Sequence, residues 1–175
     1  VGSAMATRIG HAIGAQDKPA VKLSVQVGMA ITLFIALGIM LLLLTVPGPI
    51  VNAYTDDAAI LALALLLIRL ACLFILIDAI QVTASFCLRA FKDTRFPFVV
   101  MCVTYWMITL PIGYWTGIVT AEDATAGTVN FWKAMILGIA ITAILVGIRV
   151  WHTLRKPLPA RQDTEAAPHD SLLTD

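Results

Sequence analysis

Long apolar runs, separated by short polar stretches, make up most of this chain. Four of the runs reach the roughly 20 apolar residues that a helix needs to cross a hydrocarbon core of about 30 Å, so each predicts a transmembrane helix. A shorter, small-residue segment at residues 1–15 predicts the end of a further, truncated helix. The four full runs are residues 23–46, 58–88, 96–118 and 129–151.

The connections between the runs carry turn and charge signals. Pro47, Gly48 and Pro49 with the polar stretch 52–57 favour a loop after the first run. Basic residues gather at alternate connections and after the last run, which predicts by the positive-inside rule that these parts and the C-terminus are cytoplasmic. The basic residues are Arg8, Lys18 and Lys22, then Arg89, Lys92 and Arg95, then Arg155, Lys156 and Arg161, and the acidic ones at the other connections are Asp56, Asp57, Glu122 and Asp123.

Composition supports a membrane protein. The chain is 59% hydrophobic and 13% charged, whereas soluble domains are roughly 45–50% apolar and 25% charged. We therefore predict an all-α integral membrane protein with membrane lipid as its solvent, in which residues 1–152 form the transmembrane part and residues 153–175 a polar, disordered tail. A net charge of +1 argues against a nucleic-acid partner.

Asp78 is a carboxylate inside the second apolar run. A charge at this depth costs roughly 2.5–3.5 kcal/mol on insertion scales, so such a residue is expected to face a bundle interior or a water-filled cavity. Gln81 and Ser85 follow at helical spacing and share a stripe with it, which offers oxygen ligands to a hard cation such as sodium, or neighbours to a protonatable group. The alternative is a buried carboxylate that only fixes helix register.

Two other residues of the apolar runs, Arg69 and Pro111, are candidates for a functional role. Arg69 lies nine residues before Asp78, about half a turn away around the helix, so the two side chains cannot pair along it. It either snorkels to the interface or forms a structural bond, or it takes part in substrate binding or gating. Pro111 removes a backbone hydrogen bond in the third run and is expected to kink that helix.

Motifs of enzymes are missing from the sequence. It contains no Ser/His/Asp constellation, paired catalytic carboxylates, Walker loop or dinucleotide fingerprint. The chain is therefore predicted not to be an enzyme and to need no cofactor.

Two stretches carry a resemblance to a known family. The segment VGSAMATRIGHAIGA, residues 1–15, resembles the eighth-helix signature of multidrug and toxic compound extrusion (MATE) transporters. The segment DAIQ, residues 78–81, followed by LRAFKDTRFP, residues 88–97, resembles the tenth helix of that family and the loop after it, with Ala90 where the family usually has glycine.

The resemblance covers about residues 1–152 and implies the C-terminal part of a twelve-helix, two-lobe transporter, from the end of helix eight to helix twelve. It implies export of organic cations or drugs across the cytoplasmic membrane in exchange for sodium ions or protons, with the remaining N-terminal helices as partners. Asp78 matches the acidic position of the tenth helix that binds the coupling cation in several family members.

The predicted mechanism is alternating access, in which a cation or proton at Asp78 neutralises the carboxylate and changes the preferred helix packing. Gln81 and Ser85 are expected to line the same cavity. The first alternative is a lipid-linked glycan flippase, against which the shortage of cationic residues in the spans argues. The second is a non-transporting membrane scaffold in which Asp78 holds helices together.

Overall fold

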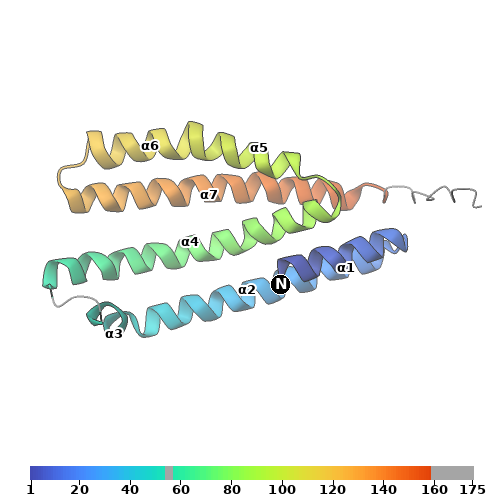
Figure 1. Ribbon diagram of the computed structural model, residues 1–175, viewed down its shortest axis with the longest axis horizontal. Coiled ribbons are helices and arrows are strands. Elements are labelled where there is room, and N and C mark those ends of the chain that lie inside the picture. The colour runs from blue at the N-terminus through green and yellow to red at the C-terminus, as the bar shows by residue number, and fades with distance from the viewer. Residues whose placement is uncertain (54–56, 159–175) are drawn as a thin grey trace, which may run out of the picture.

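The computed structural model describes residues 1–53 and 57–158, except for the side chain of Ile50. Every regular element in these residues is helical. The long helices run side by side as an elongated bundle in which α4 lies between α2 and α7, and the third span flanks α7 on its far side (Figure 1). The elements are α1 (Gly2–Gly14), α2 (Lys18–Thr45), α3 (Pro47–Asn52), α4 (Ala58–Ala90), α5 (Arg95–Val103), η1 (Thr104–Thr109), α6 (Leu110–Tyr114), η2 (Trp115–Val119) and α7 (Ala124–Arg155).

Four spans in the described residues are long and apolar enough to cross a membrane, namely α2, α4, the run from α5 to η2, and α7. The shortest of them has 25 residues, which at 1.5 Å per residue exceeds a hydrocarbon core of about 30 Å. All four predicted runs are thus confirmed as helices. They are longer than predicted, and α7 continues to Arg155.

Aspartates set the starting points of three spans. The Asp17, Asp57 and Asp123 side chains accept hydrogen bonds from backbone N–H groups in the first turns of α2, α4 and α7. The shortest of these contacts, 2.6 Å, joins Asp123 to the amide of Ala126. Each carboxylate satisfies a donor that has no partner within the helix and lies at the positive end of the helix dipole.

Two connections differ from expectation. Residues 47–52, predicted as loop, form the short helix α3 with Pro47 and Pro49 in its first turns, because proline has a helix-compatible φ and needs no N–H partner there. Between α4 and α5 the left-handed residue is Lys92, with φ of 61°. Ala90, which stands where the family usually has glycine, is the last residue of α4. The left-handed conformation of the turn falls on Lys92 instead, so alanine at position 90 does not disturb the turn.

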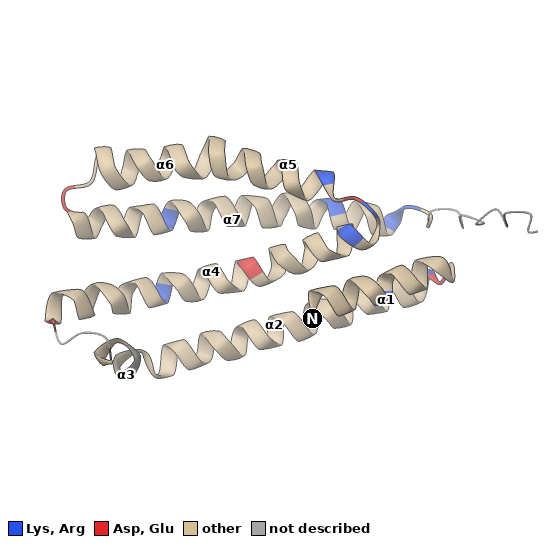
Figure 2. Ribbon diagram, viewed as in Figure 1, with Lys and Arg blue, Asp and Glu red and all other residues tan. Residues whose placement is uncertain are grey.

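The core occupies one end of the bundle. Its largest fully buried members are Ile9, Val21, Leu88 and Val146, so α1, α2, α4 and α7 all contribute. The same end holds most of the basic residues, as Figure 2 shows. Many large apolar side chains elsewhere remain exposed, with Phe34 on α2 at 78%, as expected of helices whose outer faces meet lipid or further helices.

Candidate functional site: a carboxylate inside the second span

α4 carries the predicted polar stripe. Its charged residues between the two ends are Arg69 and Asp78, which interrupt an otherwise uncharged ribbon (Figure 2). Asp78 is half-buried. Its carboxylate forms no hydrogen bond or ion pair with any residue that the structure describes; the ion pair of the described part joins Arg149 to Asp93 instead. The carboxylate is therefore not locked to a basic residue of this chain.

Gln81 and Ser85 are brought together, but Asp78 is not bonded to them. The Gln81 Nε2 donates to Ser85 Oγ at 3.4 Å, and the Ser85 hydroxyl donates to the Gln81 backbone oxygen at 2.9 Å. Only 3% of Gln81 is exposed. The two residues thus satisfy each other in the helix packing, and they do not complete a set of ligands around the carboxylate.

Tyr105, which was not predicted from the sequence, interacts electrostatically with Asp78 from the third span. It lies in η1, half-buried, near enough to Asp78 for the two side chains to interact electrostatically. The signal for it in the sequence was weak. A tyrosine in an apolar span is ordinarily read as packing or as part of an interfacial aromatic belt.

The third span changes its helical pitch on both sides of Pro111. The π-helical segments η1 and η2 flank α6, in which Pro111 is an exposed residue of the first turn. Proline has no N–H for the carbonyl four residues earlier and its ring crowds that carbonyl, so a regular α-helix cannot pass through it. Such π segments recur at functional sites, and here one of them carries Tyr105.

Glycines let the third span approach α7 closely. A Cβ atom on Gly113 would lie 2.9 Å from the Phe131 ring, and one on Gly117 would lie 3.0 Å from the Gly127 carbonyl oxygen. At Gly138 an added Cβ would collide with the Thr109 hydroxyl. Close backbone approach through small residues is a usual means of packing helices in lipid, and it fixes the position of η1.

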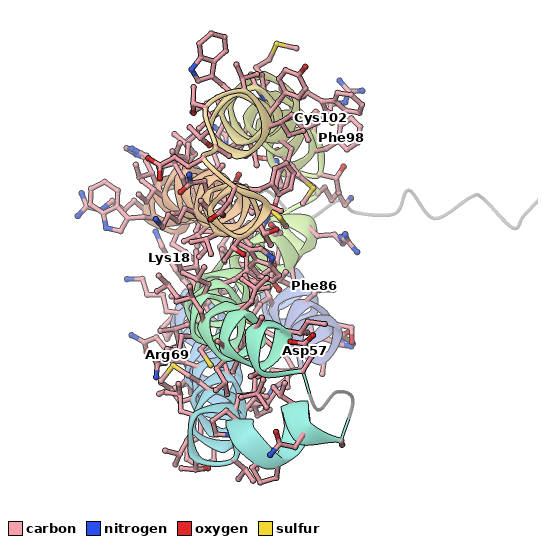
Figure 3. All side chains as sticks on the ribbon, turned by 90° about the vertical axis from the view of Figure 1, so that its left-hand side faces the viewer. Lys18, Asp57, Arg69, Phe86, Phe98 and Cys102 are labelled. Carbon is pink, nitrogen blue, oxygen red and sulfur yellow. The ribbon has the colours of Figure 1, made fainter. Side chains whose placement is uncertain are left out.

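Arg69 lies apart from these groups. Its side chain is exposed and projects from the edge of the bundle (Figure 3). The nine-residue separation from Asp78 turns the two side chains to opposite sides of α4. This placement supports the snorkelling interpretation of Arg69.

The loop with the family-like sequence is tied to α7. Asp93 accepts a hydrogen bond from the Arg149 side chain at 2.8 Å and one from the Phe96 amide at 3.4 Å. The Arg149 guanidinium also lies over the Phe96 ring, 5.1 Å from its centroid. Asp93 therefore stabilises the turn between α4 and α5 and links it to α7.

Comparison with known proteins decides the family. The sequence profile of the MatE family matches residues 1–115. The chain is 33% identical over 172 residues, 95% of its length, to the multidrug resistance protein PmpM of Pseudomonas aeruginosa. This chain belongs to the MatE family. The MATE resemblance of the sequence is thereby confirmed.

Other relatives in the MatE family give the same result. The multidrug resistance protein NorM of Photobacterium profundum is 34% identical over 86% of this chain, and a probable NorM of Xanthomonas axonopodis pv. citri is 37% identical over 89%. These matches cover 33% of each relative, and the PmpM match covers 36%. The chain thus spans about one third of the length of these MatE proteins and is a multi-pass membrane segment of that family.

No group of three or more His, Cys, Asp or Glu side chains that could hold a metal ion occurs in the described part of the chain. Asp78 is accordingly a single carboxylate with the Tyr105 hydroxyl nearby. A monovalent ion or a proton suits such a group better than a divalent metal, which takes several carboxylate or carbonyl ligands.

Proposed function

We propose that this chain is the C-terminal part of a cation-coupled antiporter that exports organic cations or drugs across the cytoplasmic membrane by alternating access. Membership of the MatE family supports this proposal, as do the relatives named multidrug resistance proteins. The observation that carries it is the half-buried Asp78 carboxylate, which has no basic partner among the described residues of a membrane-spanning helix.

Asp78 is the proposed coupling residue. An unpaired negative charge inside a membrane protein favours arrangements of helices that admit water or a cation, whereas a neutralised carboxylate favours arrangements that exclude them. The arriving sodium ion or proton therefore changes the relative free energies of two conformations by its different affinity for each. Release of the substrate and release of the coupling cation would then occur on opposite sides of the membrane.

Tyr105 and Pro111 are proposed to relay this change. Tyr105, on a π-helical segment, interacts electrostatically with Asp78, and Pro111 interrupts the regular hydrogen bonding of the same span. A charge change at Asp78 would act on the third span through this electrostatic interaction, at the place where that span deviates from α-helix. Gln81 and Ser85 would border the same region from α4.

Transport should follow a cation gradient. We expect the full-length protein in proteoliposomes to move a fluorescent organic cation when a sodium or pH gradient is imposed, and to stop when the gradient is collapsed. The measurement is dye accumulation with each gradient in turn, which also identifies the coupling ion. Equal transport with and without both gradients would contradict the antiporter.

The basic end of the bundle is proposed to face the cytoplasm, with the C-terminus on that side. Its support is the gathering of Lys and Arg at the turns after α1 and α4 and at the end of α7 (Figure 2). In intact cells, a cysteine at position 156 should resist a membrane-impermeant thiol reagent, and one at position 122 should react. Labelling at position 156 without labelling at position 122 would indicate the opposite orientation, with the basic end outside the cell.

A further inference from the structure

A cavity lies where the first turns of α2 meet the last turns of α7, at the basic end of the bundle. Its volume is about 390 Å³. Polar and basic side chains line one part of it and apolar ones the other. The first group is Lys18, Lys22, Gln26 and Arg155, and the second is Val25, Leu154 and Trp151.

Lys18 and Arg155 are held in fixed positions at this cavity. The Lys18 ammonium donates to the backbone oxygens of Lys156 at 3.0 Å and Arg155 at 3.4 Å, which joins the start of α2 to the end of α7. The Arg155 guanidinium lies over the Trp151 ring, 3.5 Å from the ring centroid. Stacking uses the face of a guanidinium and leaves the N–H groups at its edge directed sideways, where they can bind an anion.

No acidic residue lines this cavity in the part of the chain that the structure describes. Neither Lys22 nor Arg155 forms an ion pair there. The acidic residue nearest in sequence, Asp17, caps α2 by accepting a hydrogen bond from the Ala20 amide. The cavity thus carries excess positive charge on two elements that are far apart in the sequence.

The place of the cavity selects the kind of anion. It opens at the end of two membrane-spanning helices, beside a half-exposed tryptophan, which is a residue typical of the membrane interface. Figure 3 shows Lys18 at the side of the bundle, on the same side as Arg69. A soluble anion would use only the basic part, whereas a lipid would place its phosphate there and its acyl chains along the apolar part.

We propose that this cavity binds the phosphate group of an anionic membrane phospholipid. Arg155 and Lys22 would contact the phosphate through charge-assisted hydrogen bonds, Trp151 would lie at the level of the glycerol backbone, and Val25 and Leu154 would contact the first acyl carbons. Basic pockets between transmembrane helices bind anionic head groups in this manner.

The test is lipid retention by the purified full-length protein, measured by native mass spectrometry after exchange into phosphatidylglycerol or phosphatidylethanolamine. We expect phosphatidylglycerol to be retained preferentially. The double variant Lys22→Gln/Arg155→Gln should bind it about 25-fold more weakly, since each basic side chain near an anionic surface contributes roughly fivefold to the affinity. The matched control is Arg95→Gln, which removes an exposed charge at the same end outside the cavity.

Three results would overturn the proposal. They are absence of preference for phosphatidylglycerol in the unmodified protein, a loss of binding in Arg95→Gln that equals the double variant's loss per removed charge, roughly fivefold, and displacement of the lipid by millimolar inorganic phosphate. The first would mean that another segment of the full-length protein fills the cavity, the second that surface potential alone attracts the lipid, and the third that a soluble anion is the ligand.

A second measurement covers the case in which the double variant fails to fold. Trp151 lines the cavity, so phosphatidylglycerol with brominated acyl chains should quench its fluorescence more than brominated phosphatidylcholine at the same mole fraction. Trp151→Phe should abolish this difference. Equal quenching by the two lipids would contradict the proposal independently of any charge variant.

Discussion

Asp78→Asn should strongly reduce drug efflux driven by the cation gradient in the full-length protein. Asparagine has nearly the same size as aspartate but no charge to neutralise, so an arriving sodium ion or proton no longer distinguishes two conformations. Coupling between two ligands typically changes affinity by roughly 5–150-fold, and we expect gradient-driven efflux to fall by a factor in that range. The measurement is efflux per amount of folded protein in proteoliposomes.

Glu122→Gln provides the matched control. It also removes one carboxylate, but from an exposed position in the connection before α7, so efflux should remain at the level of the unmodified protein. A native rate for Asp78→Asn would contradict the coupling role. If the variant instead lowers the yield of folded protein while efflux per folded molecule stays normal, Asp78 serves the packing of the helices, as the scaffold alternative requires.

Tyr105→Phe should act in the same direction as Asp78→Asn, with a smaller effect. It removes the hydroxyl that interacts electrostatically with Asp78 and keeps the aromatic ring in η1. The two side chains interact electrostatically without a hydrogen bond, so we expect the cation concentration for half-maximal efflux to rise, by less than Asp78→Asn changes efflux. An unchanged half-maximal concentration would exclude Tyr105 from the proposed relay.

The spans could be predicted from the sequence because lipid imposes a simple requirement. Every backbone group inside the bilayer needs a partner, so an apolar run of sufficient length has to be helical. The ends were less accessible, since α7 extends past Trp151 to Arg155 and polar residues can continue a helix at the interface. The helix α3 was missed because Pro47 and Pro49 favour turns and first helical turns alike.

The site was predictable only along one helix. Helical spacing put Gln81 and Ser85 on one stripe, and the two side chains are hydrogen-bonded to each other. It could not indicate that Tyr105 interacts electrostatically with Asp78, because that interaction depends on how the third span packs and on its π-helical segments. A proline in the sequence predicts a disturbance of the helix, but which turns become π-helical is decided by contacts with α7.

Gly127 is the position in those contacts where a side chain should be tolerated least. A Cβ atom there would overlap the backbone carbonyl oxygen of Gly117, which cannot move aside as a flexible side chain could. Gly127→Ala should therefore push the third span away from α7 and lower the free energy of unfolding by about 1–3 kcal/mol, as overpacking of well-packed interiors does. The measurement is the denaturation midpoint of the full-length protein in detergent.

Gly147→Ala, in the same helix, isolates the effect of packing. No atom lies within 4 Å of a Cβ atom added at Gly147, and alanine is favoured over glycine inside a helix by roughly 0.5–1 kcal/mol. The two glycine-to-alanine changes in α7 should therefore shift the midpoint in opposite directions. Equal shifts would mean that helix propensity alone governs both positions. If only Gly127→Ala lowers the midpoint, the packing of the third span against α7 depends on the close approach of Gly127 to Gly117. The position of Tyr105 in that span would then depend on the same approach.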